Sequence, residues 1–381
     1  MKPFSSVSSA LSDPKTRSCL CSLFVTIALI CSVYFTANVY FGREFKIPFR
    51  SGTSHSKQSA KSCRNEEKCR PIGSEALPEG IVSATSNLEM HPLWGPLTEK
   101  EESNHQVSLL AIPVGIKQKE LVNQIVKMFL EDEFGVMLFH YDGVVDEWND
   151  LEWSKKVIHV SAVNQTKWWF AKRFLHPDIV TEYEYIFLWD EDLGVENFHP
   201  KRYVSIVKEE GLEISQPGLD LHKSEVHHRI TVRKRNSKVH RRFVTSNANG
   251  CKSNSSAPPC VGWVEMMAPV FSKAAWRCAW YMIQNDFIHA WGLDKKLGYC
   301  SQGDRTKKVG IVDAEYIYHL GLPTLGGDSH RIKGTPPSVH KTDNNNNRPE
   351  VRKRSYDEMK AFDNRWKRAA QQDKCWVDPF K

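Results

Sequence analysis

The sequence lacks the motifs of several common enzyme classes. No glycine is followed by another glycine two positions later, so the GxGxxG turn of dinucleotide-binding oxidoreductases is absent. There is also no GxxxxGK phosphate loop and no GxSxG nucleophile elbow. No two cysteines have the CxxC spacing of many zinc sites, and no internal repeat is visible. These absences argue against a Rossmann oxidoreductase, a P-loop enzyme and a zinc protein.

The composition is that of a folded globular protein without a nucleic-acid signature. The 381 residues are 40% hydrophobic and 11% aromatic, which is ample material for a core. The formal net charge of +7 is modest, and no known nucleic-acid-binding motif accompanies it. We therefore expect no nucleic acid among the partners.

Charged residues are missing from Ser18 to Gly42, and this stretch is long enough to cross a bilayer as a helix. A cleaved signal peptide is the competing interpretation, but it would have a shorter apolar region and a small-residue cleavage site. A buried core helix is the other alternative. We predict an uncleaved signal-anchor, which attaches the protein to the membrane through a single N-terminal helix.

The charges beside this stretch leave its orientation open. A simple count of the positive-inside rule would keep the C-terminal side in the cytosol, yet long domains translocate largely regardless of such charges. The sequons at Asn164 and Asn254 are candidate glycosylation sites and favour a luminal C-terminal side. The counted bases are Lys2, Lys15 and Arg17 before the stretch, and Arg43, Lys46, Arg50, Lys57 and Lys61 after it.

Seven cysteines follow the apolar stretch, several of them in close pairs. Close pairs are typical of disulfides formed in an oxidising compartment, which again favours the lumen. An odd number leaves one cysteine over, and Cys375 is the candidate for it. The candidate disulfides join Cys63 to Cys69, Cys251 to Cys260 and Cys278 to Cys300.

Shifts in composition divide the chain into five parts. A polar segment with scattered bases follows the apolar stretch, and a low-complexity charged segment, DNNNNRPEVRKRS, lies near the C-terminus. The stretch YDEMKAFDNRWKRAAQQ has the pattern of a short helix within that last part. We expect a cytosolic tail at 1–17, the anchor at 18–42, a stem with an irregular cysteine-containing segment at 43–104, a globular domain at 105–327 and a charged flexible tail at 328–381.

Within the globular part, apolar runs alternate with segments of helical spacing. Continuous apolar strands alternating with helices predict an α/β fold, with a mostly parallel central sheet and helices on both faces. The expected strands are 107–115, 134–143, 155–162, 183–189 and 212–218, and the expected helices are 117–132, 166–180 and 199–211.

Three acids, Asp190, Glu191 and Asp192, directly follow the apolar run YEYIFLW. Ligands of parallel sheets bind at the carboxyl ends of strands, and packed like charges need a positive partner there. Asp190 and Asp192 point to the same side of an extended chain, with Glu191 on the other. Two such carboxylates predict a site for Mg²⁺ or Mn²⁺ shared with substrate phosphates. The alternative is a solvated acidic turn that caps the next helix.

Two further segments carry candidate site residues. His319 follows a strand-like run and is a candidate third metal ligand, although a lone histidine is more often structural. The basic run 222–243 contains eight Lys or Arg residues and a single Glu. It is either a solvated loop or hairpin, or a site for an acidic substrate or donor phosphates. His227, His228 and Arg229 are its candidate substrate-pocket residues.

These stretches together resemble the plant domain-of-unknown-function 707 family, whose members are often labelled "lysine ketoglutarate reductase trans-splicing related". The resemblance covers roughly residues 63–327. The reductase label finds no support in this sequence, because no nicotinamide fingerprint is present. The motifs that carry the resemblance are LLAIPVGIKQ, FLWDEDLGVENF, SQPGLD, VEMMAPVFS, QNDFIHAWGLD and IYHLGLPTLG.

The layout is also similar to that of glycosyltransferases with the Rossmann-like GT-A fold, which have an anchor, a stem and a luminal nucleotide-sugar domain. That resemblance implies that Asp190 and Asp192 form the DxD motif that holds Mn²⁺ or Mg²⁺ on the donor diphosphate. It implies that His319 completes the metal shell and that Asp294 of the WGLD stretch activates the acceptor hydroxyl. The middle residue of the motif, Glu191, and Trp291 complete the candidate substrate pocket.

The function expected from these features is a metal-dependent glycosyltransferase of the secretory pathway. It would be a single-pass type II protein of the Golgi membrane, with the endoplasmic reticulum as the alternative location. It would transfer a sugar from a nucleotide sugar to a glycan or glycoprotein acceptor. The main alternative is a non-catalytic luminal protein of the same fold, either a carbohydrate-binding protein or a scaffold. An unrelated metal-dependent hydrolase and an oxidoreductase are further alternatives.

Overall fold

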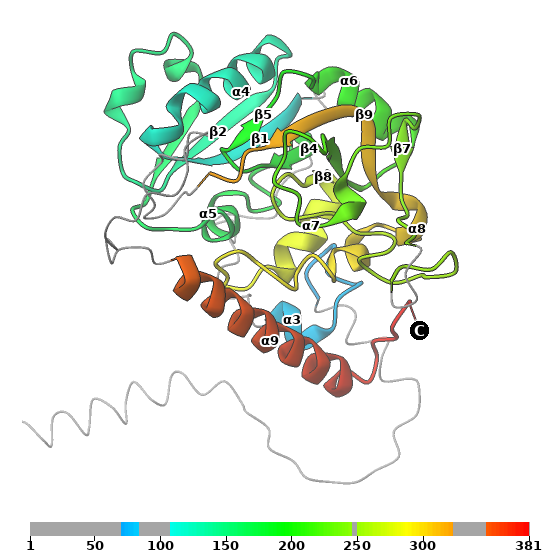
Figure 1. Ribbon diagram of the computed structural model, residues 1–381. Helices are drawn as coiled ribbons and strands as arrows, with labels where there is room; N and C mark the ends of the chain where they lie inside the picture. The colour runs from blue at the N-terminus through cyan, green and yellow to red at the C-terminus, as the bar shows by residue number, and fades with distance from the viewer. Residues whose placement is uncertain (1–69, 84–106, 246–249, 323–347, 381) are drawn as a thin grey trace, which may run out of the picture. The chain divides into compact units, whose positions relative to one another are not determined.

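A computed structural model describes residues 70–83, 107–245, 250–322 and 348–380, shown in colour in Figure 1. The predicted anchor at 18–42 and most of the predicted stem lie outside these ranges. Cys63 and Cys69 lie outside them too, so the disulfide between Cys63 and Cys69 stays a prediction. Among the described residues, no helix combines the length and apolar character that crossing a membrane requires. All of the described residues belong to one compact unit that spans residues 62–381.

The described strands form a mixed sheet in the order β3-β2-β1-β4-β8-β6-β9-β5, with β7 paired to β9. Strands β3, β2, β1 and β4 are parallel neighbours, and so are β6 and β9. The strands are β1 (Val107–Val114), β2 (Gly135–His140), β3 (Ile158–Ser161), β4 (Tyr183–Leu188), β5 (Leu193–Gly194), β6 (Ile214–Leu219), β7 (Val239–His240), β8 (Val270–Ser272) and β9 (Val309–His319).

The predicted α/β class is confirmed, but the sheet is not mostly parallel. The difference comes from β8, which runs antiparallel to both β4 and β6, and from β5 and β7, which run antiparallel to β9. These strands have two or three residues each, which is too short for an alternating pattern to appear in the sequence. Because β8 is antiparallel to both neighbours, β4, β6 and β9 still point their carboxyl ends to the same edge.

Helices cover both faces of the sheet, as expected. On one face, α4 (Lys119–Glu131) and α6 (Pro200–Glu209) pack on Leu110, Ile112 and Val114 of β1. On the other, α5 (Lys167–Phe174) and α7 (Lys273–Met282) pack on Leu109 and Ala111. Alternate side chains of β1 therefore point to opposite faces of the sheet and belong to two separate cores. The remaining described α-helices are α3 (Glu79–Ser83), α8 (Arg305–Lys308) and α9 (Arg348–Gln372).

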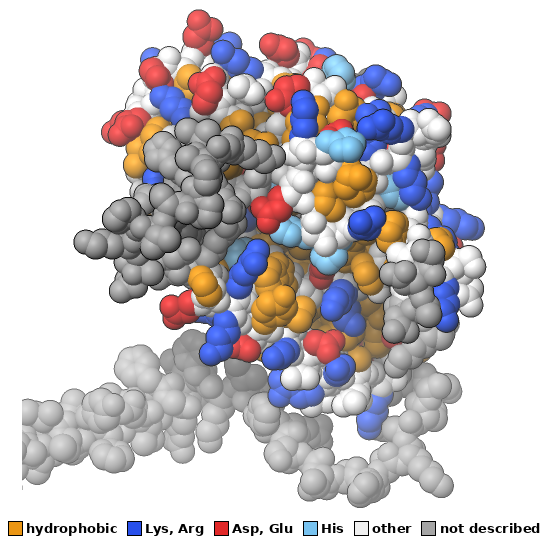
Figure 2. Space-filling model, in the orientation of Figure 1, with side chains coloured by type: hydrophobic (Ala, Val, Ile, Leu, Met, Phe, Trp, Pro, Cys, Tyr) orange, Lys and Arg blue, Asp and Glu red, His pale blue; other side chains and the backbone are white. Residues whose placement is uncertain are grey.

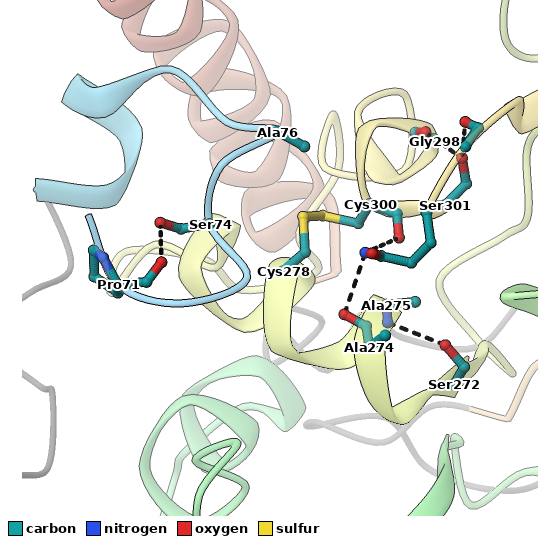
Figure 3. The surroundings of a disulfide bond; sticks show 12 residues. Pro71, Ser74, Ala76, Ser272, Ala274, Ala275, Cys278, Gly298, Cys300 and Ser301 are labelled. Atoms are coloured by element: carbon teal, nitrogen blue, oxygen red, sulfur yellow. Dashed lines mark hydrogen bonds between the residues drawn. A yellow bond between two sulfur atoms is a disulfide. The ribbon is translucent and has the colours of Figure 1, made fainter. Parts of the chain in front are cut away.

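A disulfide holds the layer that contains α7. It joins Cys278 of this helix to Cys300, and the Ser272 hydroxyl caps the helix by accepting from the Ala275 amide (Figure 3). The predicted disulfide between Cys278 and Cys300 is therefore confirmed.

The other described cysteines are also disulfide-bonded. The predicted disulfide between Cys251 and Cys260 is confirmed, with the two Cα atoms 5.3 Å apart. The prediction for Cys375 was wrong, because this cysteine is disulfide-bonded rather than left over. Counting close pairs in the sequence could not find this bond, since no other cysteine lies near Cys375 along the chain.

The C-terminal region departs most from the expected flexible tail at 328–381. Residues 348–372 form the long helix α9, and Figure 1 shows it beside α3 on the outer side of the α7 layer. Phe362, Trp366 and Ala369 are buried in the core with α7, so the globular domain extends past residue 327. The last residues also meet the first ones described, because Arg70 donates to Asp373 at 2.5 Å.

Two neighbouring histidines, His140 at the end of β2 and His159 in β3, form a partly buried pair. His140 is fully buried, and its Nε2 atom is 2.8 Å from Nδ1 of His159. Burial, together with the charge of His159, lowers the pKa of His140 to about 4 against the opposing charge of Asp142. Between about pH 6.5 and pH 4 the unfolded chain therefore binds a proton at this position that the folded chain does not.

We expect the free energy of unfolding to fall by up to about 3 kcal/mol from this residue as the pH drops from about 6.5 to about 4. Urea unfolding of the wild type and of His140→Gln at a series of pH values measures the effect, and the variant should lose this part of the slope. The exposed His222→Gln is the control and should keep the wild-type slope. Equal slopes in the wild type and His140→Gln would contradict the prediction.

Candidate functional site

The acids of the candidate site lie where β4 and β9 end. Asp190 follows β4, and its amide donates to the Met267 carbonyl at 2.8 Å. Three residues later, β5 pairs antiparallel with the end of β9, so that Leu193 is opposite His319. This pairing places Nε2 of His319 3.6 Å from a carboxylate oxygen of Asp192. The structure therefore brings together residues that are far apart in the sequence.

Lys167 supplies positive charge to the acid cluster. Its ammonium group donates to Asp190 Oδ1 at 2.6 Å and to the Met266 carbonyl at 2.7 Å, and its side chain is 8% exposed. Asp190 remains 36% exposed, so the pair lies at an opening rather than inside the core. The repulsion among the acids is thus offset by a cation that the chain carries itself.

Glu191 lies on the other side of the chain, as the alternation predicts. Its side chain is 2% exposed and accepts from the Gly115 amide at 2.7 Å and from the Tyr141 hydroxyl. Burial raises the pKa of Glu191 to about 8, although both hydrogen bonds lower it. Contrary to our expectation, Glu191 does not line an open substrate pocket, because its carboxyl group is enclosed by the ends of β1 and β2.

The geometry around His319 leaves one ring nitrogen directed at Asp192. Nδ1 is 2.9 Å from the Glu225 carbonyl, which can only accept, so Nδ1 carries the hydrogen. In the neutral ring, Nε2 is then the acceptor that faces Asp192. Burial lowers the pKa of His319, but the negative charge of Asp192 and the Glu225 hydrogen bond outweigh it and raise the pKa.

Asp192 and His319 have the donor chemistry of a divalent-cation site. A carbonyl that orients a histidine through its other ring nitrogen is a common feature of metal ligands. Among the described residues, however, no three His, Cys, Asp or Glu side chains are close enough to hold a metal ion by themselves. The third expected ligand, Asp190, is paired with Lys167. The residues therefore fit a cation that is held by one or two side chains and completed by phosphate oxygens.

A second group of polar side chains lies near the first. The Asp294 carboxylate accepts from the amides of Gly292 and Lys295, at 3.0 and 2.8 Å, and burial raises its pKa. The ring of His228 lies against Trp263, and the charges of His228 and Asp294 act on each other's pKa. The structure thus places Asp294 and His228 in one cluster, although they come from separate segments of the sequence.

Glu265 joins the two groups, and sequence reasoning missed it. Its Oε2 atom is buried and has no hydrogen-bond partner within the described part of the chain. Burial raises the pKa of Glu265 to about 7, and the charges of Asp294 and Asp190 raise it further while that of His319 lowers it. The signal in the sequence was a single acid inside an otherwise apolar run, VGWVEMMAPVF.

The other predicted pocket residues are placed differently. The ring of His227 packs edge-on against His319 at 5.6 Å, so it adjoins the acid cluster. Arg229 is exposed at the start of a short 3-10 helix, Arg229–Thr231. Trp291 packs between His289 and Tyr356. Figure 2 shows several histidine side chains on one face, among acidic and basic ones.

The two sequons are accessible in the structure. Asn164 and Asn254 are both exposed, and Asn164 lies in a turn with a φ of 60°. Their glycosylation stays a prediction.

Comparisons with known proteins give a family and distant structural likenesses. No curated protein matches the chain. Among solved structures it is similar to crystal structures of S. aureus TarS, and it spans less than two thirds of each. Residues 1–349 of TarS give a TM-score of 0.35 at 9% identity, over 56% of this chain and 60% of that one. The same fragment in complex with UDP gives a TM-score of 0.37 at 8% identity, with the same coverage. A further TarS structure gives a TM-score of 0.34 at 11% identity, over 56% of this chain and 36% of that one.

A family model covers most of the chain. It matches residues 68–372, which include every strand and helix described above. The match extends through α9, in agreement with the packing of that helix on the domain. The chain therefore belongs to the family described as "Protein of unknown function (DUF707)".

Proposed function

We propose that the protein is a glycosyltransferase that transfers a sugar from a nucleotide-sugar donor to a glycan or glycoprotein, with a fold of the GT-A type. The observation that carries the proposal is the proximity of two groups of polar side chains, because charges from both groups act on Glu265. One group holds Asp190, Asp192 and His319 with Lys167 beside them, and the other centres on Asp294. The first suits a diphosphate and the second suits an acceptor hydroxyl.

The donor side follows from charge. The Lys167 ammonium group offers positive charge to a diphosphate, and Asp192 and Nε2 of His319 offer ligand atoms to Mn²⁺ or Mg²⁺. When bound, such a cation neutralises the charge that develops on the leaving diphosphate. Asp190 keeps Lys167 in place at the opening, so that its ammonium group adjoins the same phosphates.

The transfer itself needs one base. The acceptor oxygen bonds to the anomeric carbon, and the bond between that carbon and the diphosphate oxygen breaks with its electron pair leaving on the diphosphate. The hydroxyl proton passes to a carboxylate, which we assign to Asp294 because two backbone amides fix its position and its partly buried site favours proton uptake.

We further propose that this reaction takes place in the lumen of the Golgi or the endoplasmic reticulum, with the protein held as a single-pass type II membrane protein. Disulfide-bonded cysteines suit an oxidising compartment, and both sequons are exposed.

The test is a thermal-stability titration of the full chain with UDP-, GDP- and CMP-linked sugars, with and without Mn²⁺. At a concentration of about 100 times its Kd, one nucleotide sugar should raise Tm by roughly 5 °C in the presence of Mn²⁺. Asp192→Asn should abolish this rise because it removes the charge but keeps the shape of the side chain. The exposed Asp150→Asn is the matched control and should respond like the wild type, because Asp150 pairs with Lys119 at the start of α4.

The outcomes separate the parts of the proposal. A rise in Tm that does not depend on Mn²⁺ would contradict the metal site. Lys167 and His319 would then be the groups that balance the charge of the diphosphate. No rise with any donor, in a chain that unfolds cooperatively, would contradict the proposed transferase and favour the non-catalytic alternative, a carbohydrate-binding or scaffold protein of the same fold.

A further inference from the structure

The segment 283–296, which carries Asp294, is held in place by α9. Hydrogen bonds from three positions of the helix reach it, and the backbone passes close to the helix at Gly292. There the φ of +94° suits glycine, and a Cβ would approach the Met359 side chain to 3.0 Å. The hydrogen bonds are Ile288 N to Glu358 Oε2 at 2.9 Å, His289 Nδ1 to Ser355 Oγ at 2.7 Å and Arg365 Nη2 to Asp286 Oδ2 at 2.8 Å.

Three rings from these two elements are in continuous contact. His289 stacks on Trp291 with ring centroids 5.5 Å apart and an interplanar angle of 25°. Tyr356 of α9 meets Trp291 edge to face at 4.9 Å. Tyr356 is 52% exposed, His289 is exposed as well and Trp291 is partly so. Neither element alone could form this surface, because Trp291 lies between His289 of its own segment and Tyr356 of α9.

The surface lies within reach of the charges of the acid cluster. Burial lowers the pKa of His289, and the charge of Asp190 raises it while that of Lys167 lowers it. At the middle of the series, Trp291 lies close before Asp294 in the same segment. Two of the rings therefore belong to the segment that carries Asp294, and the third belongs to α9.

Exposed aromatic rings of this kind suit a carbohydrate. A sugar ring has an apolar face of C–H groups that packs on an aromatic face, and its hydroxyls stay in reach of polar groups at the ring edges. Here the tyrosine hydroxyl and the imidazole nitrogen of His289 provide such polar edges. A purely apolar partner would offer no hydrogen bond to the tyrosine hydroxyl or to the imidazole nitrogen.

We propose that His289, Trp291 and Tyr356 form a binding surface for a sugar unit of the acceptor chain, and that α9 contributes to it directly. This inference rests on the proposed function, since it gives the acceptor a defined position beside Asp294. It assigns to the C-terminal helix a part in recognising the acceptor as well as in packing.

The test measures binding of the full chain to an array of oligosaccharides of common hexoses and pentoses, followed by titration with those that bind. Tyr356→Ala should weaken binding by about tenfold or more, because it removes the ring that α9 adds to the surface. Tyr356→Phe keeps the ring and should retain most of the affinity. The exposed Arg368→Ala, farther along α9, is the control and should bind as the wild type does. Circular dichroism of each variant checks that α9 is still folded.

The nucleotide-sugar titration described above runs in parallel and separates the two proposals. Donor binding without any oligosaccharide binding, or with binding that Tyr356→Ala leaves unchanged, would overturn the sugar-binding surface and leave the transferase standing. Oligosaccharide binding that depends on the Tyr356 ring, without a response to any donor, would support the surface and contradict the transferase.

Discussion

Replacement of Asp294 by asparagine is expected to lower the rate of sugar transfer by about 10²- to 10⁴-fold, the usual contribution of a general base. The asparagine oxygen can still accept from the amides of Gly292 and Lys295, so the segment should keep its conformation. The amide cannot take up the acceptor proton. Stabilisation of the protein by the nucleotide sugar should therefore remain unchanged, and only turnover should fall. The rate of nucleotide release in the presence of donor and acceptor measures turnover.

Glu265→Gln is the matched comparison for this experiment. Glu265 is a partly buried carboxyl group of the same cluster, and the charges of both Asp190 and Asp294 act on its pKa. Full turnover in Asp294→Asn together with loss of turnover in Glu265→Gln would contradict our assignment and move the base to Glu265.

The second large effect concerns stability. Trp366→Ala in α9 should lower the free energy of unfolding by about 3–5 kcal/mol, because it opens a cavity in a well-packed core. The indole is 3% exposed and packs against Tyr299 at 4.8 Å, with the ammonium group of Lys296 4.9 Å from its ring. Urea denaturation followed by circular dichroism measures the change.

Arg368→Ala provides the control for this prediction. Its side chain is exposed on the same helix, so the substitution should change stability by no more than about 0.5 kcal/mol. If Trp366→Ala were as stable as Arg368→Ala, α9 would not be an integral part of the domain. Phe362 and Ala369 are buried on the same side, so the helix should behave as one unit with the α7 layer.

The parts of the structure that could be predicted from sequence are those with local signals. The apolar run of β4 and the acids after it are adjacent in the chain, so a strand ending in an acidic cluster follows directly. His319 was predicted to be near them because both segments looked like strands that end at the same edge. Close spacing likewise indicated the disulfides of Cys251 with Cys260 and of Cys278 with Cys300, since short loops favour them.

The parts that could not be predicted depend on tertiary contacts. Lys167 resembles an ordinary exposed lysine at the start of a helix, and only the fold shows that it reaches Asp190. Glu265 needed the knowledge that its neighbours are buried on every side. The apolar positions of α9 are so diluted by charged residues that composition suggested a solvated tail, whereas Phe362, Trp366 and Ala369 share one face.

The contact between the first and last described residues has a consequence for the order in which the protein is made. Residues 70–83 leave the ribosome early, yet many of their partners are in α9 and the segment after it, where Asp373 also accepts from the Glu79 amide at 2.9 Å. The nascent chain therefore exposes the outer surface of the α7 layer until α9 has been synthesised. Chaperones would meet that apolar surface on ribosome-bound chains that contain α7 but not yet α9, and a chain released at that stage would keep the surface exposed.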